Sequence, residues 1–294
     1  MKDLRDKTAF ITGGSSGIGL GIAKVLAEEG MKVVITYRGQ PHLDEAMSYF
    51  QSRPTLQIHP IRLDVTDRSA FAAAADEAEA RFGKVQVLVN NAGIAVGGLL
   101  ENATYRDWDE VLGTNLGGVI NGLVTFLPRI VESGLEGHIV NVSSVGGLVA
   151  LGPTGIYTTS KFAVTGLTEA LCADMAGRNI GISVFCPGSV RSNIGARRRE
   201  QAEHATAPVG KAAEQAKAMA AFVAHGMDPV TAGRHVLRGI RANRLFILSH
   251  PEFRDNIRAR GDALERAMLG VPADEARAAT IGWLQEGNPY QPEP

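Results

Sequence analysis

The sequence predicts an α/β fold, in which a doubly wound, Rossmann-type parallel sheet of about seven strands has helices on both faces. Short apolar runs alternate with stretches of helical periodicity along most of the chain. A glycine-rich turn follows the first of these runs and opens the first helix. The runs are apolar at nearly every position, as is typical of strands covered on both faces. No internal repeat and no linker divides the 294 residues, so we expect a single domain over residues 1–294.

The first half of the chain predicts four strands separated by three helices. The strands are expected over residues 8–12, 32–36, 56–63 and 85–89. The first helix follows the glycine turn and is expected to end at Gly30, and the second covers about 43–51. Thr66 or Asp67 is expected to cap the third helix, which stops at Gly83.

The second half predicts three further helices and three further strands. The helices are expected over residues 105–112, 115–131 and 157–175. The strands are expected over residues 139–142, 182–185 and 245–248. Pro128 lies inside the second of these helices and is expected to bend or end it.

Two segments depart from this alternation. Residues 193–228 are rich in Ala, Arg, Glu, Gln and His, and they directly follow a strand end, where an open α/β sheet binds its ligand. We interpret them as a helical substrate lid; a solvated helical excursion is the alternative. Residues 273–294 form a C-terminal extension whose proline-rich end is expected to fray.

Composition and charge exclude several classes of function. A net charge of -1 gives no basis for nucleic-acid binding, and no uninterrupted apolar run reaches the ~18 residues of a membrane span. The charged N-terminus leads directly into a strand, so no signal peptide is expected. Cys172 and Cys186 lie in apolar segments and predict free thiols in a reducing cytoplasm. The histidines lack metal-ligand spacing, so we expect no metal. The positions expected at the surface or the pocket edge are His138, His225, His235 and His250.

The glycine-rich turn predicts a dinucleotide site. A tight reversal lets a pyrophosphate approach the backbone, and the N–H groups and dipole of the helix N-terminus favour the anion. A turn with a structural role alone is the alternative, and the strand–turn–helix context argues against it. The cofactor-binding residues expected here are Gly13, Ser15, Ser16, Gly17, Ile18 and Gly19.

The end of the second strand predicts which dinucleotide binds. An acidic residue there would hold the ribose 2′-hydroxyl of NAD and repel the 2′-phosphate of NADP. This chain instead has Tyr37 followed by Arg38. The guanidinium can pair with the phosphate and stack on adenine, so we expect NADP(H), with Tyr37 and Arg38 at the site. An ordinary surface arginine is the alternative.

Residues 139–161 predict the catalytic centre. Ser143 and Ser144 end a strand, and a Gly/Pro-rich loop leads to Tyr157 and Lys161, four residues apart. On a helix this spacing places the phenol and the ammonium on one face, one turn apart. A hydroxyl at the strand end can converge on the same point, which predicts hydride-transfer chemistry on an alcohol or ketone. The alternative is a packing phenol beside a solvated lysine.

These motifs, in this order, resemble those of the short-chain dehydrogenase/reductase family over residues 8 to about 192. Residues 12–19 are similar to the family's glycine turn, and Tyr157-x-x-x-Lys161 to its signature pair. Ser144 precedes Tyr157 by thirteen residues, the family's usual interval, so the resemblance selects Ser144 over Ser143. It also assigns Asn115 to the catalytic tetrad. The further cofactor contacts that it implies are Asp64, Val65, Asn91, Ala92, Gly93, Tyr157, Lys161, Pro187, Gly188, Val190 and Ser192.

The expected mechanism uses Tyr157 as the acid and base. A phenol has a pKa near 10, and Lys161 together with a positive nicotinamide ring would favour the phenolate and lower that pKa. Tyr157 then takes the alcohol proton as hydride leaves to NADP, or returns it in reduction. The resemblance adds three roles: Ser144 polarises the substrate oxygen, Lys161 binds the nicotinamide ribose, and Asn115 positions a water as a proton relay.

The predicted function is an NADP(H)-dependent oxidoreductase that interconverts a secondary alcohol and a ketone. The expected pocket segments are mainly small or aliphatic, which favours a hydrophobic or aromatic substrate. These segments are 95–99, 145–154, 189–194 and part of 195–228. The alternatives are a hydroxysteroid or polyketide-type ketoreductase and a sensor that binds NADP without turnover.

The resemblance implies relatives and an assembly as well. Segments 117–128 and 242–251 and the C-terminal extension are similar to those of bacterial dehydrogenases that oxidise the benzylic alcohol of lignin-derived aryl ethers. Those enzymes usually have an acidic residue at the position of Tyr37 and use NAD, and this chain departs from them there. Family likeness further implies a homodimer or homotetramer packed through the helices at about 105–131 and 157–176.

Overall fold

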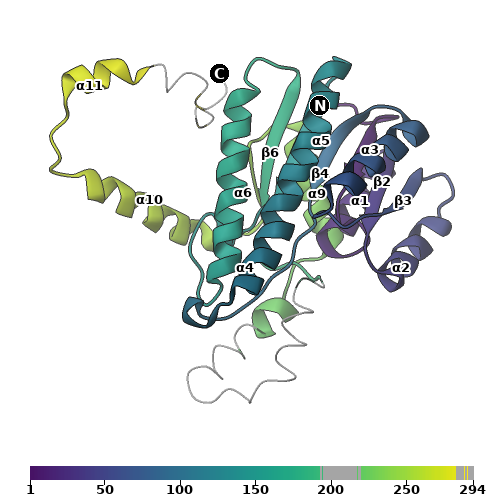
Figure 1. Cartoon of the computed structure of the whole chain (residues 1–294), viewed down its shortest axis with the longest axis horizontal. Coiled ribbons are helices and arrows are strands. Elements are labelled where there is room, and N and C mark those ends of the chain that lie inside the picture. Colours follow the sequence, from purple (N-terminus) through teal and green to yellow (C-terminus); the bar gives the residue numbers. More distant parts are fainter. Residues whose placement is uncertain (193, 195–216, 218–219, 283–287, 289, 291–294) are drawn as a thin grey trace.

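The computed structural model describes residues 1–192, 194, 217, 220–282, 288 and 290. Its centre is a seven-stranded sheet in the order β3-β2-β1-β4-β5-β6-β7. Every neighbouring pair of strands is parallel, and helices pack on the sheet (Figure 1). The predicted single α/β domain with a doubly wound sheet is confirmed.

Each predicted strand overlaps an observed one and differs from it by at most two residues at either end. The strands are β1 (Thr8–Ile11), β2 (Lys32–Tyr37), β3 (Ile58–Arg62), β4 (Val85–Asn90), β5 (Gly137–Val142), β6 (Ile180–Cys186) and β7 (Phe246–Leu248). The α-helices are α1 (Gly17–Glu28), α2 (Gln40–Gln51), α3 (Arg68–Phe82), α4 (Tyr105–Leu112), α5 (Gly118–Ser133), α6 (Gly155–Asp174), α9 (Pro229–Arg241), α10 (Arg254–Met268) and α11 (Glu275–Thr280). Short helical turns are η1 (Leu100–Asn102), η2 (Gly113–Gly117), η3 (Val145–Gly147) and η4 (Pro251–Phe253).

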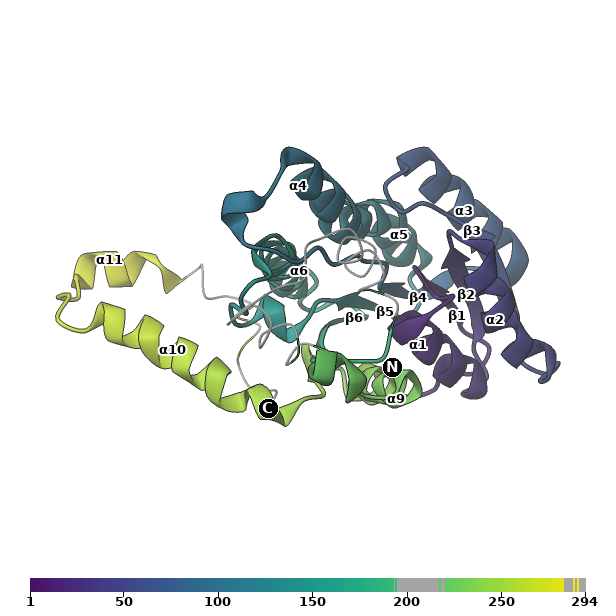
Figure 2. The same cartoon turned by 90° about the horizontal axis from the view of Figure 1, so that it is seen from below.

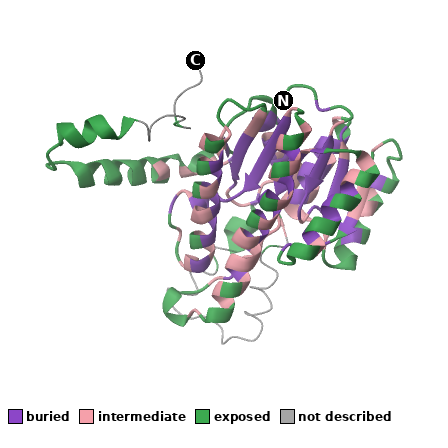
Figure 3. Ribbon diagram, turned by 45° about the horizontal axis from the view of Figure 1, so that its top comes forward, coloured by how far each residue is buried: buried purple, intermediate pink, exposed green. Residues whose placement is uncertain are grey.

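Successive residues of most strands enter two hydrophobic cores, one on each face of the sheet. In β1, Ala9 and Ile11 belong to the first core and Phe10 to the second. Helices α1, α2 and α9 contribute to the first core, whereas α3, α5 and α6 contribute to the second (Figure 2). The strands β2, β1, β4, β5 and β6 are buried along most of their length, whereas the edge strands β3 and β7 are less covered (Figure 3). The apolar sequence of these inner strands therefore follows from coverage on both faces.

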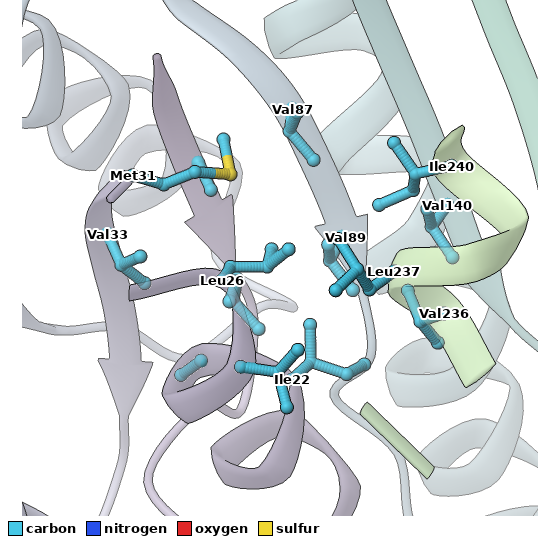
Figure 4. Packing of buried hydrophobic residues seen from close by; sticks show 14 of the residues in the cluster. Ile22, Leu26, Met31, Val33, Val87, Val89, Val140, Val236, Leu237 and Ile240 are labelled. Carbon is cyan, nitrogen blue, oxygen red and sulfur yellow. The ribbon is translucent and has the colours of Figure 1, made fainter. Parts of the chain in front are cut away.

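The first core packs α1, near the start of the chain, against α9, which is more than 200 residues away in the sequence. Figure 4 shows Ile22 and Leu26 of α1 and the α9 residues Val236, Leu237 and Ile240 around the same strands. The two helices touch through glycine. A Cβ on Gly21 would lie 1.9 Å from the carbonyl oxygen of Pro229, and one on Gly233 would lie 2.5 Å from that of Gly21. Only glycine allows this approach of backbone to backbone.

Helix ends follow local sequence signals. Asp67, rather than Thr66, caps α3, and its carboxylate accepts a hydrogen bond from the Ala70 amide at 2.9 Å. Gly83 ends α3 with a positive φ of 82°, as predicted. Pro128 lies inside α5, and the helix continues beyond it to Ser133. Of the two expected effects of Pro128, ending the helix is therefore wrong, and bending it stays a prediction.

The helices predicted over 105–112 and 115–131 form one continuous helical segment, Tyr105–Ser133. A five-residue π-helix, Gly113–Gly117, joins α4 to α5. The segment is 29 residues long, and an 18-residue stretch within it has a mean hydropathy of 1.3, so by length and composition it could cross a membrane. However, Leu123, Phe126 and Ile130 are buried in the second core against the sheet. It is a core helix of the α/β domain.

The two unusual segments are described only in part. Of the predicted lid, residues 193, 195–216 and 218–219 lie outside the described residues, so the lid prediction is not tested there. Residues 220–224 are helical, and Met227 forms an isolated bridge with Val190. Helices α10 and α11 have no buried residues and extend away from the sheet (Figures 1 and 2). Helix α11 falls within the predicted C-terminal extension.

His138 lies in the sheet and not at the surface, so its predicted position was wrong. It is fully buried in β5, where its Nε2 lies 2.8 Å from the Ser183 hydroxyl. Its Nδ1 has no hydrogen-bond partner among the described residues. Burial lowers the pKa of His138 to about 3.

This buried imidazole is expected to make stability depend on pH. The unfolded chain gains a proton at His138 below pH ~6.5, whereas the folded chain resists it until about pH 3. Stability from this group is therefore lost as the pH falls through that window, by about 2–3 kcal/mol at pH 4.5. Urea titrations at pH 7 and pH 4.5 should show a smaller acid-induced loss in His138→Gln than in the unmodified protein. Equal losses in both proteins would contradict this assignment.

Candidate active site

A cleft of about 1100 Å³ runs along the carboxyl ends of the strands. In an open parallel sheet this edge is where ligands bind, because loops leave the strands in diverging directions there. The walls include nearly every residue that the sequence assigned to the cofactor. These are Gly13, Ser15, Ser16, Gly17, Ile18, Tyr37, Arg38, Asp64, Val65, Asn91, Ala92, Gly93, Tyr157, Lys161, Pro187, Gly188, Val190 and Ser192.

The glycine turn lies between β1 and α1 and exposes the N-terminus of α1 to the cleft. No side chain among the described residues caps this helix at Ser16, so its first amides are available to an anion. Gly17 has a φ of 49°, and a Cβ there would lie 2.7 Å from Cβ of Ser192. Gly19 does not line the cleft: a Cβ there would lie 2.4 Å from the Gly13 carbonyl oxygen, so Gly19 lets the turn close.

Asn91 fixes the loop after β4 to this turn. Its amide donates hydrogen bonds to the carbonyl oxygens of Thr12 and Gly13, at 2.8 and 3.2 Å. The Thr12 hydroxyl in turn accepts from the amides of Asn91 and Ala92 at 2.9 and 3.0 Å. The predicted cofactor loops from β1 and β4 are thus held together before any ligand binds.

The far end of the cleft has a positive charge close to a carboxylate. The Asp64 carboxylate accepts hydrogen bonds from the Thr66 amide at 3.0 Å and hydroxyl at 2.8 Å. The backbone hydrogen bond from Thr66 is the main reason that the pKa of Asp64 is lowered. Arg38 lies 4.0 Å from Asp64, and 71% of its side chain is exposed. The guanidinium can therefore turn towards a ligand with little cost.

The two serines at the end of β5 face different partners. Ser143 donates to the carbonyl oxygen of Lys161 at 2.9 Å and lies 2.8 Å from the Thr165 hydroxyl, so it ties β5 to α6. The Ser144 hydroxyl accepts from the Gly146 amide at 3.1 Å and is hydrogen-bonded to Tyr157. Ser144 is thus the serine next to the phenol, in agreement with the thirteen-residue interval.

Tyr157 and Lys161 lie on one face of α6, in its first two turns. The Lys161 ammonium is 5.6 Å from the centre of the Tyr157 ring and donates to the Val142 carbonyl oxygen at 3.0 Å. Burial lowers the pKa of Lys161 to about 8. Burial also raises the pKa of Tyr157, and the hydrogen bond from Ser144 only partly offsets this.

Burial, and not Lys161, is the largest influence on the pKa of Tyr157 in the protein alone; the predicted lowering by Lys161 together with a nicotinamide ring stays a prediction. The Lys161 ammonium is itself destabilised by burial. The Tyr157 phenol therefore holds its proton at neutral pH. A nearby thiol adds no negative charge at that pH, because burial raises the pKa of Cys186 to about 12.

Asn115 lies in the π-helix η2 and is fully buried. Its carbonyl accepts from the Ile94 amide at 2.8 Å, and its amide donates to the Ile94 carbonyl at 2.9 Å and to Ser160 at 3.0 Å. A point at the Cβ position of Gly93 would lie 3.2 Å from the Asn115 side-chain oxygen and 3.6 Å from the Lys161 ammonium. Asn115 thus stands behind the cleft wall, close to Lys161. Short π-helical segments within α-helices often occur at functional sites.

The cleft wall also includes apolar side chains that were not assigned to the cofactor, among them Val96, Leu151, Ile194, Phe222 and Val223. The pocket segments predicted over 95–99, 145–154 and 189–194 all contribute, although Leu99 itself is exposed and does not line the cleft. Within the described residues there is no cluster of three or more histidine, cysteine, aspartate or glutamate side chains that could hold a metal.

His250 was expected at the surface or the pocket edge, and it lies beside a loop of the cleft wall, although sequence reasoning gave it no role. His250 follows β7, and its Nδ1 accepts a hydrogen bond from the Gly188 amide at 3.0 Å. Its position directly after a strand, at the ligand edge of the sheet, is the signal that could have identified it. Phe222 falls within residues 195–228, part of which was expected to line the pocket, and it is part of the cleft wall.

A family model described as short chain dehydrogenase matches residues 7–203 of this sequence. The chain belongs to this family. As a short-chain dehydrogenase it is an oxidoreductase that acts on an alcohol or ketone and uses a nicotinamide cofactor. The glycine turn and the uncapped α1 N-terminus fit such a dinucleotide.

The chain is similar along most of its length to three other proteins. A C alpha-dehydrogenase from Sphingobium sp. strain SYK-6 is 37% identical over 276 residues, which cover 93% of this chain and 90% of that protein. The apo crystal structure of LigO from the same strain is 42% identical, covers 100% of both chains and has a TM-score of 0.79. A Burkholderia phymatum short-chain dehydrogenase/reductase in complex with NAD is 32% identical, covers 93% of this chain and 99% of that one, and has a TM-score of 0.82.

Proposed function

We propose that this short-chain dehydrogenase uses NADP(H) to interconvert a secondary alcohol and a ketone on a hydrophobic or aromatic substrate. The observation that supports this most directly is the convergence of Ser144, Tyr157 and Lys161 in a cleft whose other end has Arg38. A bound nicotinamide ring supplies or accepts the hydride. The protein itself must supply the proton, hold the substrate oxygen and bind the dinucleotide.

Proton transfer is assigned to Tyr157. Its phenol keeps its proton because burial raises its pKa, so it is ready to donate to the oxygen of a ketone. The Ser144 hydroxyl, next to Tyr157, has a single proton, which it turns from the phenol to the same substrate oxygen when a ketone binds. Lys161 holds its ammonium below about pH 8 and stabilises the phenolate that remains. Asn115 lies beside Gly93 and close to Lys161, and it supports the path by which Tyr157 regains a proton after it has donated one.

The preference for NADP(H) rests on charge at the end of β2. Tyr37 and Arg38 line the cleft there, where an acidic residue would exclude a 2′-phosphate. Arg38 is exposed and its distance to Asp64 is 4.0 Å, so a phosphate can compete for it. Its guanidinium presents two parallel donors, which suit a phosphate better than a hydroxyl.

The apolar side chains of the cleft wall support an aryl-substituted substrate. We expect Phe222→Ala to raise KM for an aryl ketone about tenfold, because removing an aromatic wall costs roughly 1–2 kcal/mol of apolar contact. The KM for a short aliphatic ketone, which cannot reach that wall, serves as the matched control and should change little. Steady-state rates of NADPH oxidation measure both. Equal changes for the two ketones would place the aryl group elsewhere.

One panel of assays tests the proposal against its alternatives. NADPH and NADH oxidation are followed by absorbance with aryl ketones, steroid ketones and a polyketide-like diketone. Turnover of aryl ketones with NADPH supports the proposal, whereas preferred turnover of steroids or diketones supports the alternative reductases. Tight NADPH binding by calorimetry with no turnover of any ketone supports a sensor. Equal affinities for NADH and NADPH would contradict the assignment of Arg38 to the 2′-phosphate.

The protein is also proposed to act as a homodimer or homotetramer. The segment Tyr105–Ser133 leaves apolar side chains at its surface, with Tyr105 90% and Val124 70% exposed. Association through this segment and α6 would cover them. Light scattering of the purified protein measures the mass of the assembly.

A further inference from the structure

The loop that follows β6 is held by a histidine from the other end of the chain. The Gly188 amide donates to Nδ1 of His250 at 3.0 Å. On the opposite side of the ring, Nε2 of His250 lies 3.0 Å from the Ser189 carbonyl oxygen. A carbonyl can only accept, and the amide can only donate, so Nε2 must have the proton and Nδ1 must be free of it. One neutral tautomer satisfies both contacts.

Strand pairing brings His250 to this place. The register of β6 and β7 aligns Cys186 with Leu248, and two residues further along each chain lie Gly188 and His250. The ring also packs against the loop: a Cβ on Gly188 would lie 2.7 Å from the His250 ring and 3.1 Å from that of Phe253. The Ser249 hydroxyl lies 2.9 Å from Nδ1. His250 is half-buried and thus has a fixed position.

The same loop is held on its other side by the catalytic region. The Val145 amide donates to the Pro187 carbonyl oxygen at 2.9 Å, and the Ser144 hydroxyl lies 3.5 Å from that oxygen. The Met227 amide donates to the Ser189 carbonyl oxygen at 2.8 Å. A shift of the loop would therefore disturb both the wall of the cleft at Pro187 and Gly188 and the hydrogen bonds of Ser144.

We propose that His250 is a positioning residue, which sets the Pro187–Gly188–Ser189 loop against the reacting end of the dinucleotide and does so only as the neutral imidazole. The role at the dinucleotide rests on the proposed function. The role in holding the loop rests on the hydrogen bonds alone. Protonation of Nδ1 removes the acceptor for the Gly188 amide and places two N–H groups opposite each other, which loosens the loop. Activity is thereby coupled to pH through a residue that touches neither substrate nor cofactor.

The charged and titratable neighbours of His250 are few among the described residues. On α9, His235 interacts with it, and burial, Arg238 and His250 together lower the pKa of His235. On its own segment, the exposed Glu252 and Arg254 follow. On the loop side, Arg191 is paired with Asp228 at 3.1 Å.

Three substitutions separate the two hydrogen bonds of the ring. His250→Asn places a side-chain oxygen where Nδ1 stands, so it accepts from Gly188 and cannot titrate. His250→Gln places its amide nitrogen near the position of Nε2 and offers Gly188 no acceptor at the position of Nδ1. His250→Phe keeps the ring shape and loses both bonds. His235→Gln, which removes the neighbouring imidazole that does not bond to the loop, is the control.

The expected results distinguish positioning from a structural role. At pH 8, His250→Phe should lower kcat about 10- to 100-fold, because a small misplacement of reacting groups is costly, while His250→Asn stays within about threefold. Between pH 8 and pH 5.5, kcat for ketone reduction should fall in the unmodified enzyme and in His235→Gln more steeply than in His250→Asn. Equal losses in the Asn and Phe variants, or parallel pH profiles of the Asn variant and the unmodified enzyme, would overturn the proposal.

Hydrogen exchange tests the loop without substrate or cofactor. At pH 7 the Gly188 amide should exchange slowly in the unmodified protein and in His250→Asn, and at least tenfold faster in His250→Phe and His250→Gln. Unchanged protection in the Phe variant would refute the hydrogen-bonding role. If the unmodified protein binds no dinucleotide, the proposed function fails while this exchange result still decides whether His250 holds the loop.

Discussion

Replacement of Tyr157 by phenylalanine is expected to lower kcat for ketone reduction by about 10³-fold and to leave the affinity for NADPH within about threefold. The substitution removes one hydroxyl and keeps the ring that packs in the first turns of α6. That hydroxyl is the proton donor that burial keeps protonated, next to Ser144. General acid catalysis by a positioned side chain contributes roughly 10²–10⁴-fold, and the hydrogen bond to the substrate oxygen is lost as well.

The matched control is Tyr49→Phe. Tyr49 lies in α2, where its hydroxyl is hydrogen-bonded to Glu28 on the surface, so the same chemical change is made far from Ser144. Stopped-flow or steady-state absorbance gives kcat, and fluorescence titration gives the NADPH affinity for each variant. Activity retained in Tyr157→Phe to within about tenfold would refute its role as the acid, and a similar loss in Tyr49→Phe would show that the effect is not local.

Arg38→Asp is expected to exchange the cofactor preference, lowering NADPH affinity by about 100-fold and raising that for NADH. The substitution removes the guanidinium that we assign to the 2′-phosphate and places a carboxylate in its stead. Charge-assisted hydrogen bonds of this type contribute about 1.5–3 kcal/mol, and repulsion between the new carboxylate and the phosphate adds to the loss. Because Arg38 is 71% exposed, the fold should tolerate the change.

Arg62→Asp provides the control for this charge reversal. Arg62 ends β3 opposite Tyr37 in the sheet register and is exposed, but it does not line the cleft. Calorimetric titration of each variant with both dinucleotides gives the ratio of affinities. A ratio that stays constant in Arg38→Asp, or that shifts equally in Arg62→Asp, would contradict the assignment and leave the cofactor preference to be explained by other contacts.

The sheet and the cleft could be predicted from sequence because their signals are local. The apolar runs follow directly from strands covered on both faces, and the glycine turn sits between the first run and a helical pattern. The Tyr157–Lys161 pair is also local, since one helical turn fixes its geometry. The interval from Ser144 to Tyr157 depended on the family resemblance, and spacing alone left Ser143 open.

What sequence reasoning missed depends on contacts between distant segments. His138 is a polar residue beside an apolar run, yet its strand, β5, lies inside the sheet between β4 and β6, and its ring meets Ser183 of β6. The π-helix at Gly113–Gly117 is only five residues long, so it leaves no hydrophobic periodicity in the sequence by which it could be predicted. In the protein alone, burial is the main influence on the pKa values of Tyr157 and Lys161, and the depth of burial depends on tertiary packing that the sequence does not show.

The contact between α1 and α9 has a consequence for how the protein is made. Helix α1, which bears the turn at the dinucleotide site, is among the first segments synthesised, whereas the helix that covers it begins at Pro229. In a nascent chain, α9 is therefore absent from one face of the N-terminal strands until about four-fifths of the protein has been translated. The site that starts at residue 13 is completed late in synthesis, and a product truncated before α9 would expose apolar surface that chaperones and proteases recognise.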